Sequence, residues 1–497
     1  MLNFVELVDN TSVYEVMEPS PLDFAKLLSQ NDTNTNIWLK REDTLPVKSF
    51  KLRGAYNKIS KLEKSDLEKG VIAVSAGNHA QGVAFTAKKL GIDATIIMPL
   101  TTPDIKINAV KSYGAKVIIH GESFSDTFDK CEEIQSKTNA VFIPPYDDLM
   151  IVAGQGTIGK EILDQNPEVE TIVIPIGGGG LIAGVGTYIK SMNPNIKIIG
   201  VEAEDSACMK AAFEANDFVD LEHVGSFADG VAVKRAGNIT FELAKKCVDE
   251  LITVSTDQIC EAIQDIYNES RTIVEPAGAI SLAGINKLMS SSSDLVINKN
   301  VVGINSGANM TFERLRFVTE RTMLASAREA LFSIKLPERS GALLELTQNV
   351  VKQHSITEFN YRKQDDSNAF IFIGISSKDS TDRDLFIKSL NNFGYEYKDM
   401  SHNEVAISHV RHMVGGKHPN EEAIWELRFP ERPGALEDFL KSLQKECNIT
   451  LFHYRYTGGD VARVLVGISN CKFEQIQLPK NFRATKVTDD TGVSDFL

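Results

Sequence analysis

Four short segments of the chain combine residue types that could bind a small anionic molecule and carry out chemistry on it. The first is SFKLRGA, residues 49–55, in which Lys51 stands between two apolar residues close to the expected start of a helix. Removing a lysine amine from water lowers its pKa, and a neutral amine is a nucleophile toward an aldehyde. The alternative is a surface lysine on a short amphipathic helix, and this segment alone favours that alternative.

The second segment is SAGNHAQG, residues 75–82, which follows an apolar run directly and opens a helix-like stretch. Its small residues let the backbone approach a ligand, and the free N–H groups of a helix start can bind a carboxylate. Asn78 offers a neutral amide that can hydrogen-bond an oxygen on a ring. The alternative is a plain turn capped by Asn78. We interpret His79 as a packed or capping residue rather than a base.

The third segment is GGGGL, residues 177–181, between an apolar run and a helix-like stretch. Four glycines are costly in chain entropy, and they make sense where backbone amides must hold a phosphate at a helix start. The same region also fits the dinucleotide pattern G-x-G-x-x-A through Gly178, Gly180 and Ala183, with Glu202 at the end of the next strand. This segment alone does not decide between a nucleotide and another phosphate ligand.

The fourth segment is NSGAN, residues 305–309, where the hydroxyl of Ser306 could face a heteroaromatic nitrogen at the end of a strand. Its alternative is an ordinary turn.

A further segment, GQGTIGK at residues 154–160, has the glycine and lysine spacing of a nucleoside-triphosphate loop. Glu161 stands where that loop needs a Ser or Thr to hold magnesium, so we reject this function for it.

Strand-like and helix-like segments alternate from about residue 37 to residue 310, and they must position the four segments. Continuous Val and Ile runs between helices indicate parallel strands that are buried on both faces. Such strands are expected over residues 71–76, 94–99, 115–121, 171–176, 196–202 and 301–306. The pattern predicts a doubly wound α/β fold with its ligands at the carboxyl ends of the strands.

The C-terminal third of the chain repeats itself after one long helix expected over residues 311–330. Residues 332–376 align with residues 425–469 without a gap, and both copies contain PER, GAL and a final GIS. Each copy reads strand, Pro/Gly loop, helix, strand, strand, which is the start of a ferredoxin-like βαββαβ unit. Two such units side by side would make a natural site for a small effector.

Composition limits the function classes further. The 497 residues are enough for about three domains, and the formal net charge of −14 argues against a nucleic-acid partner. No apolar run reaches the length of a membrane span, and the N-terminus lacks the basic and apolar regions of a signal peptide. The six cysteines are scattered, which is typical of reduced thiols in a cytoplasmic protein without a disulfide or metal framework.

Together, the four segments in this order resemble the fold-type-II pyridoxal-phosphate enzymes. With the duplicated tail, the chain is most similar to the biosynthetic threonine deaminase (threonine ammonia-lyase) family. The resemblance covers essentially the whole chain, and further motifs carry it: EPAGA (275–279), FNYR (359–362), HVRHMVGG (409–416) and FHYR (452–455).

The resemblance implies a two-lobed catalytic domain like the tryptophan synthase β subunit over residues 1–325, with a small lobe at about 54–155. Two ACT-like, ferredoxin-like regulatory domains would follow at 329–401 and 422–497. For the glycine-rich segment, the resemblance favours the 5′-phosphate of pyridoxal phosphate over a dinucleotide.

The resemblance also implies roles for individual residues. Lys51 would be joined to the aldehyde carbon of pyridoxal 5′-phosphate and would move the substrate's Cα proton. Asn78 would bond the 3′-oxygen of the ring, and Ser306 would face the ring nitrogen. The phosphate would be bound by backbone amides of Gly177, Gly178, Gly179, Gly180 and Leu181, and the substrate carboxylate by Ser75, Ala76, Gly77, Asn78 and His79.

The implied reaction converts L-threonine, and also L-serine as a further substrate, into the 2-oxo acid and ammonia. For threonine the product is 2-oxobutanoate, and the reaction is the first step of isoleucine biosynthesis. Isoleucine would inhibit and valine could activate through the tail, where Tyr361 and Tyr454 are the candidate effector residues. Their alternative is strand core or interface packing. The family implies a cytoplasmic homotetramer without a membrane or nucleic-acid partner.

Two departures from related serine racemases are informative. Those enzymes place a serine where this chain has Ala76, and a methyl group cannot move a proton, so we expect poor racemisation. They also bind a divalent ion through carboxylates after the strand that ends at Glu202. Here Cys208 occupies the later carboxylate position, and because hard cations prefer oxygen ligands, we predict no Mg²⁺ or Ca²⁺ at this place.

Three other functions are alternatives for this sequence. A serine dehydratase or cysteine synthase would share the cofactor, but the regulatory tail argues against both. An enzyme that binds NAD through the glycine-rich segment would lack the absorbance of pyridoxal phosphate. An amino-acid sensor built on the tail would leave Lys51 unexplained.

Overall fold

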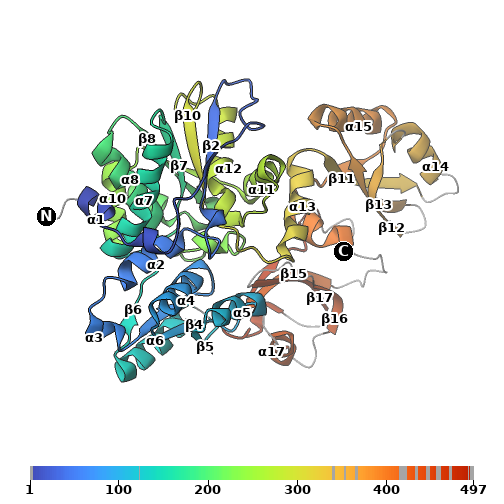
Figure 1. Ribbon diagram of the computed structural model, residues 1–497. Coiled ribbons are helices and arrows are strands. Elements are labelled where there is room, and N and C mark those ends of the chain that lie inside the picture. The colour runs from blue at the N-terminus through green and yellow to red at the C-terminus, as the bar shows by residue number, and fades with distance from the viewer. Residues whose placement is uncertain are drawn as a thin grey trace. The chain divides into compact units, whose positions relative to one another are not determined.

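A computed structural model of the chain (Figure 1) describes residues 4–122, 124–337, 342–351, 354–363, 368–412, 422–430, 435–443, 448–454, 461–469, 473–490 and 492. The chain divides into two compact units, Met1–Phe312 and Glu313–Leu497. Within the described residues, none of the helices has the length and hydrophobicity that crossing a bilayer requires.

The larger sheet of the first unit has six strands in the order β1-β2-β10-β7-β8-β9. All neighbouring strands are parallel except β1 and β2, which are antiparallel. The strands are β1 (Leu22–Phe24), β2 (Asn36–Arg41), β7 (Thr171–Pro175), β8 (Lys197–Ala203), β9 (Glu250–Val254) and β10 (Asn300–Asn305). Every residue of β7 is buried, as the Val and Ile runs of the sequence predict for strands covered on both faces.

The smaller sheet of this unit has four parallel strands in the order β5-β4-β3-β6. They are β3 (Val71–Val74), β4 (Ala94–Met98), β5 (Lys116–Ile119) and β6 (Val141–Phe142). Each sheet has its own apolar cluster, one around Ile172 and Ile182 and the other around Ile96 and Val83. The unit is therefore two-lobed and parallel α/β, which confirms the predicted fold class.

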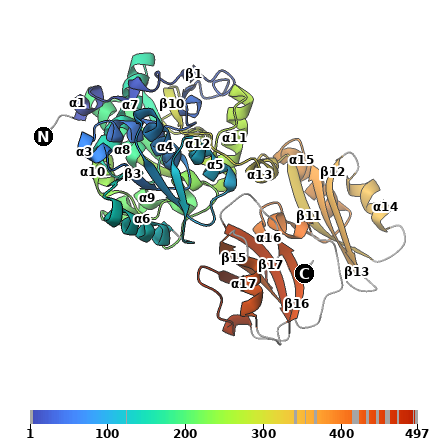
Figure 2. The ribbon, with the colours of Figure 1, turned by 60° about the horizontal axis from the view of Figure 1, so that its bottom comes forward.

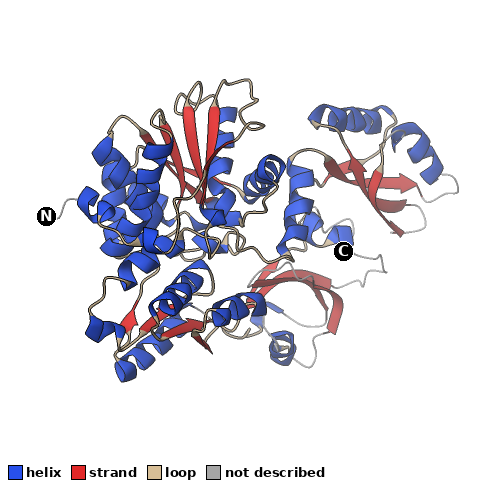
Figure 3. Ribbon diagram, in the orientation of Figure 1, coloured by secondary structure: helices blue, strands red, loops and turns tan. Residues whose placement is uncertain are grey.

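Helices cover both sheets of the first unit, as Figure 3 shows in blue around red strands. They are α1 (Phe4–Asp9), α2 (Lys51–Ile59), α3 (Lys64–Leu67), α4 (Asn78–Leu90), α5 (Asp104–Ser112), α6 (Phe124–Thr138), α7 (Leu149–Gln165), α8 (Gly180–Met192), α9 (Cys208–Ala215), α10 (Asn238–Cys247), α11 (Thr256–Ser270) and α12 (Pro276–Ser290). Short 3-10 helices lie at η1 (Val13–Glu15), η2 (Glu42–Thr44), η3 (Glu204–Ser206) and η4 (Asp229–Val231).

Helices α2 and α7 pack closely because glycines face each other at their contact. A Cβ added to Gly154 would lie 2.8 Å from the Cα of Gly54, and one added to Gly54 would lie 2.7 Å from Ile151. The sequence GQGTIGK is thus the middle of helix α7 and not a phosphate loop, which confirms the rejection of a nucleoside-triphosphate site. This contact fixes the position of α2, at whose first residue Lys51 lies.

The second unit contains the two predicted modules, whose separate sheets Figure 2 shows. The first has β11 (Glu329–Pro337), α14 (Ala342–Leu346), a π-helical turn at Thr347–Val351, β12 (Ile356–Lys363), β13 (Asn368–Ser376), α15 (Ser380–Asn392) and β14 (Tyr397–Asp399). The second has β15 (Glu422–Pro430), α17 (Ala435–Ser442), β16 (Asn448–Tyr454), β17 (Val461–Ser469), η7 (Phe473–Gln475) and β18 (Arg483–Lys486). Between the modules lie α16 (Glu404–Ser408) and η6 (Val410–His412).

The two modules share one antiparallel topology, in the orders β12-β13-β11-β14 and β16-β17-β15-β18. Both also carry a register shift at the same repeat position, between Ile356 and Glu358 in β12 and between Ile449 and Leu451 in β16. A β-bulge retained at equivalent positions of both copies supports the duplication that the sequence indicates.

The predicted helix over residues 311–330 is wrong at both ends. Helix α13 spans Arg314–Ala325, and Ala327 adopts a left-handed backbone with φ of 53°. The N–H of Arg328 closes the helix end on the carbonyl of Met323, and Glu329 already belongs to β11. Residues 326–330 are good helix formers, but the pairing of β11 with β13 outweighs that local preference.

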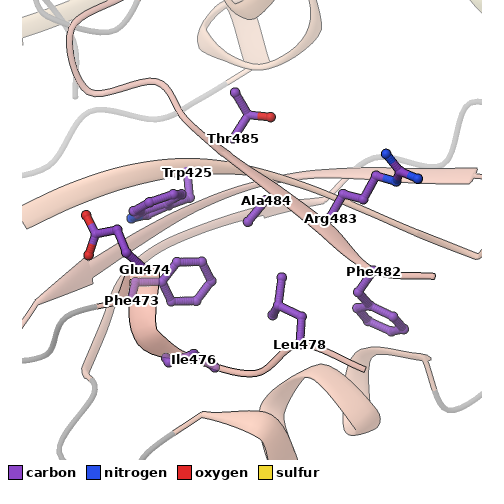
Figure 4. A pocket seen from close by; sticks show the side chains of 9 residues that line it. All are labelled: Trp425, Phe473, Glu474, Ile476, Leu478, Phe482, Arg483, Ala484 and Thr485. Atoms are coloured by element: carbon purple, nitrogen blue, oxygen red, sulfur yellow. The ribbon is translucent and has the colours of Figure 1, made fainter. Parts of the chain in front are cut away.

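The second module has a 3-10 turn where the first has α15. Its connection between the third and fourth strands, residues 470–482, is shorter than residues 377–396 and contains Pro479, which disfavours a helix. A cavity of about 540 Å³ lies between this segment and the sheet (Figure 4). The cavity is lined from the connection by Phe473, Ile476, Leu478 and Phe482, and from the strands by Trp425 and Ala484.

Candidate active site

The four segments singled out in the sequence lie at the carboxyl ends of strands or at the first turns of helices in the first unit. Ser75 and Asn305–Ser306 mark the ends of β3 and β10, and Gly177–Gly180 follow β7. In parallel α/β sheets, ligands bind at these strand ends, so the described fold places the candidate residues where such a site is expected.

Lys51 is the first residue of α2, and as a whole the residue is half-buried. Nζ donates a hydrogen bond of 2.8 Å to the carbonyl of Pro145 and lies 5.4 Å from the ring centre of Phe50. Burial lowers the pKa of this amine to about 8, although the nearby carboxylate of Glu275 acts in the opposite direction. A much larger fraction of the amine is therefore neutral near pH 7 than for an ordinary lysine.

The segment before Lys51 is tied to the segment that contains Ser306. Ser49 forms an isolated antiparallel bridge with Gly307, and the N–H of Phe50 donates to the carbonyl of Ser306 at 3.1 Å. Ser306 is buried, and its hydroxyl donates to the carbonyl of Ala277 at 3.1 Å. The first and fourth candidate segments are thus brought together in space.

The second candidate segment forms the start of α4. Gly77 is the residue before the helix, and its N–H donates to the hydroxyl of Ser75 at 3.1 Å. A Cβ added to Gly77 would meet no atom within 4 Å, so there is open space beside the backbone here. Ala76 lies between these two residues and is half-buried. The helix start can receive an anionic group in that space.

His79 is buried in the first turn of α4. Its Nε2 lies 2.8 Å from the carbonyl of Ile143. Burial, together with the positive charge of Lys51, lowers the pKa of this imidazole to about 3. His79 is therefore neutral at physiological pH, and its contact with the Ile143 carbonyl fits a packed residue better than a base.

The third segment forms a tight loop into α8. Gly179 has a φ of 94°, a backbone region that favours glycine, and a Cβ on Gly178 would lie 2.4 Å from the ring of Tyr146. The carbonyl of Gly178 accepts a hydrogen bond of 2.6 Å from the hydroxyl of Thr240, while the N–H groups of the first helical turn lack helical partners. This loop has the small residues and the backbone donors that a phosphate group requires.

Glu275 lies in the site, although its motif EPAGA indicates no role for it in the sequence alone. The carboxylate is buried, and Asn78 donates to its Oε1 from Nδ2 at 2.5 Å. Burial, and next the charge of Asp229, raises the pKa of Glu275 to about 7. No sequence signal connects Glu275 with Asn78, because the two residues are far apart along the chain.

Glu202 and Cys208 mark the place where the sequence predicts no divalent cation. Both carboxylate oxygens of Glu202 accept backbone N–H bonds, from Met209 and Lys210, each at 2.8 Å. Among the described residues, no group of three or more His, Cys, Asp or Glu side chains could hold a metal ion. The absence of a cation at this place stays a prediction.

The candidate effector residues Tyr361 and Tyr454 occupy equivalent positions on β12 and β16. The backbone of Tyr361 pairs with Ile371, and that of Tyr454 pairs with Val464. Their side chains lie outside the described residues, so their role stays a prediction.

Comparison with known proteins assigns the chain to a family. Residues 13–307 match the pyridoxal-phosphate dependent enzymes, and residues 320–410 and 414–496 match the C-terminal regulatory domain of threonine dehydratase. The biosynthetic L-threonine dehydratase of Escherichia coli is 45% identical over 93% of this chain and 90% of that protein. The mitochondrial threonine dehydratase of Saccharomyces cerevisiae is 44% identical over 100% of this chain and 89% of that protein.

Solved structures of related enzymes resemble part of the chain. The processed form of threonine deaminase isoform 2 from Solanum lycopersicum is 44% identical, with a TM-score of 0.62 over 64% of this chain and 92% of that one. Maize serine racemase is 30% identical, with a TM-score of 0.60 over 64% of this chain and 97% of that one. The chain belongs to the threonine dehydratase family of pyridoxal-phosphate-dependent enzymes.

The residues of the site fit this cofactor. An amine with a lowered pKa, a glycine-rich helix start and open space beside Gly77 together supply what an aldehyde, a phosphate and a planar ring need. The family match shows that the enzyme depends on pyridoxal phosphate, and the role of the glycine-rich segment toward that cofactor stays a prediction.

Proposed function

We propose that the chain is an L-threonine ammonia-lyase that opens isoleucine biosynthesis, and that the residues of the site hold the roles that the sequence resemblance implies. The observation that carries the proposal is the half-buried Lys51, whose amine has a pKa of about 8, in the same unit as the loop at Gly177–Gly180 and the start of α4. The catalytic domain of this proposal is residues 1–325, of which α13 belongs to the second compact unit.

The cofactor would be held by a small set of groups. Lys51 would be linked to its aldehyde carbon, Asn78 would donate to its ring oxygen, and the N–H groups of Gly177, Gly178, Gly179, Gly180 and Leu181 would bind its phosphate. When bound, the cofactor withdraws electrons from the substrate's Cα. Ser306 would face the ring nitrogen, and its hydroxyl, which now donates to Ala277, would have to turn to do so.

The chain's own residues then bind threonine and move its protons. Ser75, Ala76, Gly77, Asn78 and His79 would bind the carboxylate at the start of α4. The amine of Lys51 would take the proton from Cα, which requires its neutral form. That proton is then available for the hydroxyl that leaves from Cβ. One water is lost when the hydroxyl leaves, and one water is taken up when ammonia is released. Threonine therefore gives 2-oxobutanoate and ammonia with no net change in water.

Serine is the expected second substrate, because it presents the same amine, carboxylate and β-hydroxyl. Racemisation should be poor, since Ala76 offers no proton-moving group on the face where related racemases have a serine. We also propose that no divalent cation takes part at Glu202, whose oxygens are engaged by backbone N–H groups. Activity should therefore be insensitive to a chelator.

The second unit is a regulatory domain by family, and we propose that isoleucine inhibits and valine can activate through its modules at 329–401 and 422–497. Tyr361 and Tyr454 stay the candidate effector residues. An effector that prefers one arrangement of the modules changes activity by linkage. We further propose that the enzyme is a cytoplasmic homotetramer, since symmetric assembly is common among oligomeric enzymes.

The test is a product assay with threonine, serine and O-acetylserine, with and without isoleucine. The proposal expects 2-oxobutanoate from threonine, less turnover of O-acetylserine, and inhibition by isoleucine. Turnover of serine or O-acetylserine without threonine turnover would instead support the serine dehydratase or cysteine synthase alternative.

A further inference from the structure

The side chain of Glu275 turns away from the helix that it precedes. Glu275 occupies the position before α12, where a carboxylate commonly accepts an N–H of the first helical turn, but its side chain makes no such bond. Oε1 instead accepts from Nδ2 of Asn78 at 2.5 Å, and Oε2 accepts the N–H of Asn309 at 3.2 Å. The carboxylate is thus directed to the residue that we propose to bond the cofactor's ring oxygen.

These contacts determine which way the Asn78 amide faces. Its Oδ1 accepts a hydrogen bond of 2.7 Å from Nδ2 of Asn309, whose other proton goes to the carbonyl of Val47 at 2.8 Å. A flipped Asn78 amide would set its NH₂ against the Asn309 donor and its oxygen against the Glu275 carboxylate. One N–H of Asn78 Nδ2 is used by Glu275, and the second remains to donate to a ligand.

Close packing holds the carboxylate in place. A Cβ on Gly307 would lie 2.4 Å from Oε1 of Glu275, and one on Gly230 would lie 3.6 Å from the same oxygen and 4.0 Å from Nδ2 of Asn78. The N–H of Glu275 donates to the carbonyl of Gly307 at 3.1 Å. Gly307 therefore leaves just enough room for the carboxylate, whereas a Cβ on Gly230 would be in ordinary van der Waals contact with it.

The charged groups around Glu275 come from three other elements. Asp229 of η4 forms an ion pair of 2.5 Å with Lys106 of α5, and both act on the charge of Glu275. The amine of Lys51 on α2 senses Glu275, while His79 of α4 is neutral. The negative charge of the Glu275 carboxylate thus raises the pKa of the Lys51 amine, whereas burial lowers it.

We propose that Glu275 is a positioning residue of the reaction: its carboxylate orients the Asn78 amide toward the cofactor's ring oxygen and supplies the negative charge that the Lys51 amine faces. This inference rests on the proposed function. In this role Glu275 acts through Asn78 and Lys51 and not by contact with the substrate.

The Glu275→Gln variant separates this role from a merely structural one. Its amide would set an NH₂ either against the N–H of Asn309 or against Nδ2 of Asn78, so one of the two contacts that orient the Asn78 amide is lost, and the charge near Lys51 is removed. Loss of that charge should shift the pH midpoint for recombination of apoenzyme with pyridoxal phosphate to lower pH, by roughly one unit. The kcat should fall by up to about 10²-fold, with a smaller change in KM for threonine.

The matched control is Glu202→Gln, which neutralises another buried carboxylate in the same unit. It should leave the recombination midpoint unchanged even where it lowers the thermal midpoint of unfolding. Glu275→Asp keeps the charge and shortens the side chain, so it should retain the wild-type recombination midpoint while kcat falls. These variants keep the test decisive if Glu275→Gln folds poorly.

The inference is overturned if Glu275→Gln recombines with the wild-type pH profile and retains kcat, or if Glu275→Asp and Glu202→Gln shift the midpoint as far as Glu275→Gln does. A wild-type protein that forms no 2-oxobutanoate would instead contradict the proposed function itself. An active wild type with an unaffected Glu275→Gln variant contradicts this inference alone.

Discussion

Nη1 of Arg53 lies 2.6 Å from Oε1 of Glu161, and both side chains are closed off from solvent. Arg53 also bonds Glu42 through Nε at 2.7 Å, and Lys40 bonds Glu161 at 2.7 Å, so two cations and two carboxylates are buried together. Burial opposes the charge of Arg53, but its carboxylate partners outweigh it and hold its pKa above the usual range. Because Arg53 lies two residues after Lys51 on α2, this network holds that helix in place close to Lys51.

Replacing Arg53 with Met should destabilise the protein strongly. The change leaves the Glu42 and Glu161 carboxylates buried with too little positive charge, a situation that costs about 3–5 kcal/mol. Urea unfolding of the holoenzyme measures the loss. Arg316→Met is the control, because the Arg316 side chain is 66% exposed in its pair with Glu320 and its loss should change stability by less than about 1 kcal/mol. Equal losses in the two variants would contradict a structural role for the network.

The pH dependence of cofactor binding should report the lowered pKa of Lys51. The neutral amine attacks the aldehyde, and the neutral fraction grows about tenfold per pH unit below the pKa of about 8 and levels off above it. The rate of recombination of apoenzyme with pyridoxal phosphate should therefore rise up to about pH 8 and then flatten. A rate that keeps rising toward pH 10 would show an ordinary lysine.

A side chain larger than hydrogen at Gly178 of the glycine-rich loop should clash with Tyr146. Gly178→Ala places a methyl group 2.4 Å from the ring of Tyr146, so the loop or the ring must move. Affinity for pyridoxal phosphate should fall by roughly tenfold or more, as equilibrium dialysis can measure, because overpacking costs about 1–3 kcal/mol. The double variant Gly178→Ala, Tyr146→Ala should regain part of the loss. No recovery would mean that Tyr146 is not the obstacle.

We expect Glu404 to take part in the coupling between isoleucine binding and catalytic activity. Within the second unit, it bonds Arg321 of α13 at 2.5 Å and Arg463 of β17 at 2.9 Å, so one carboxylate joins the helix that follows the first unit to the second module. Burial opposes its charge, but the two arginines outweigh it and lower its pKa. Glu404→Gln should raise the isoleucine concentration for half inhibition by roughly 5-fold or more while basal activity is kept. Unchanged inhibition would exclude this carboxylate from the coupling.

Local patterns in the sequence suffice for the parallel α/β fold and for the duplicated modules, because Val and Ile runs and repeats act over short distances. They also place Lys51, Asn78 and Ser306 at the correct strand and helix ends. They fail where distant residues decide the outcome. Residues 326–330 favour a helix until β13 pairs with β11.

The partners of the site residues were not predictable for the same reason. Arg53 stands beside Lys51 in the sequence, yet its carboxylates come from η2 and from the middle of α7. Glu275 precedes a proline at a helix start, which indicates a cap, and only the approach of α4 turns it toward Asn78. Side-chain pairing across the fold carries no periodic signal in a single sequence.

The most direct test of the account is borohydride reduction of the protein with bound pyridoxal phosphate, followed by peptide mapping. We expect the purified protein to absorb as a pyridoxal-phosphate enzyme and reduction to fix the cofactor on Lys51. Lys51→Ala should neither retain the label nor form 2-oxobutanoate from threonine. Label on another lysine, or full threonine turnover by Lys51→Ala, would contradict it.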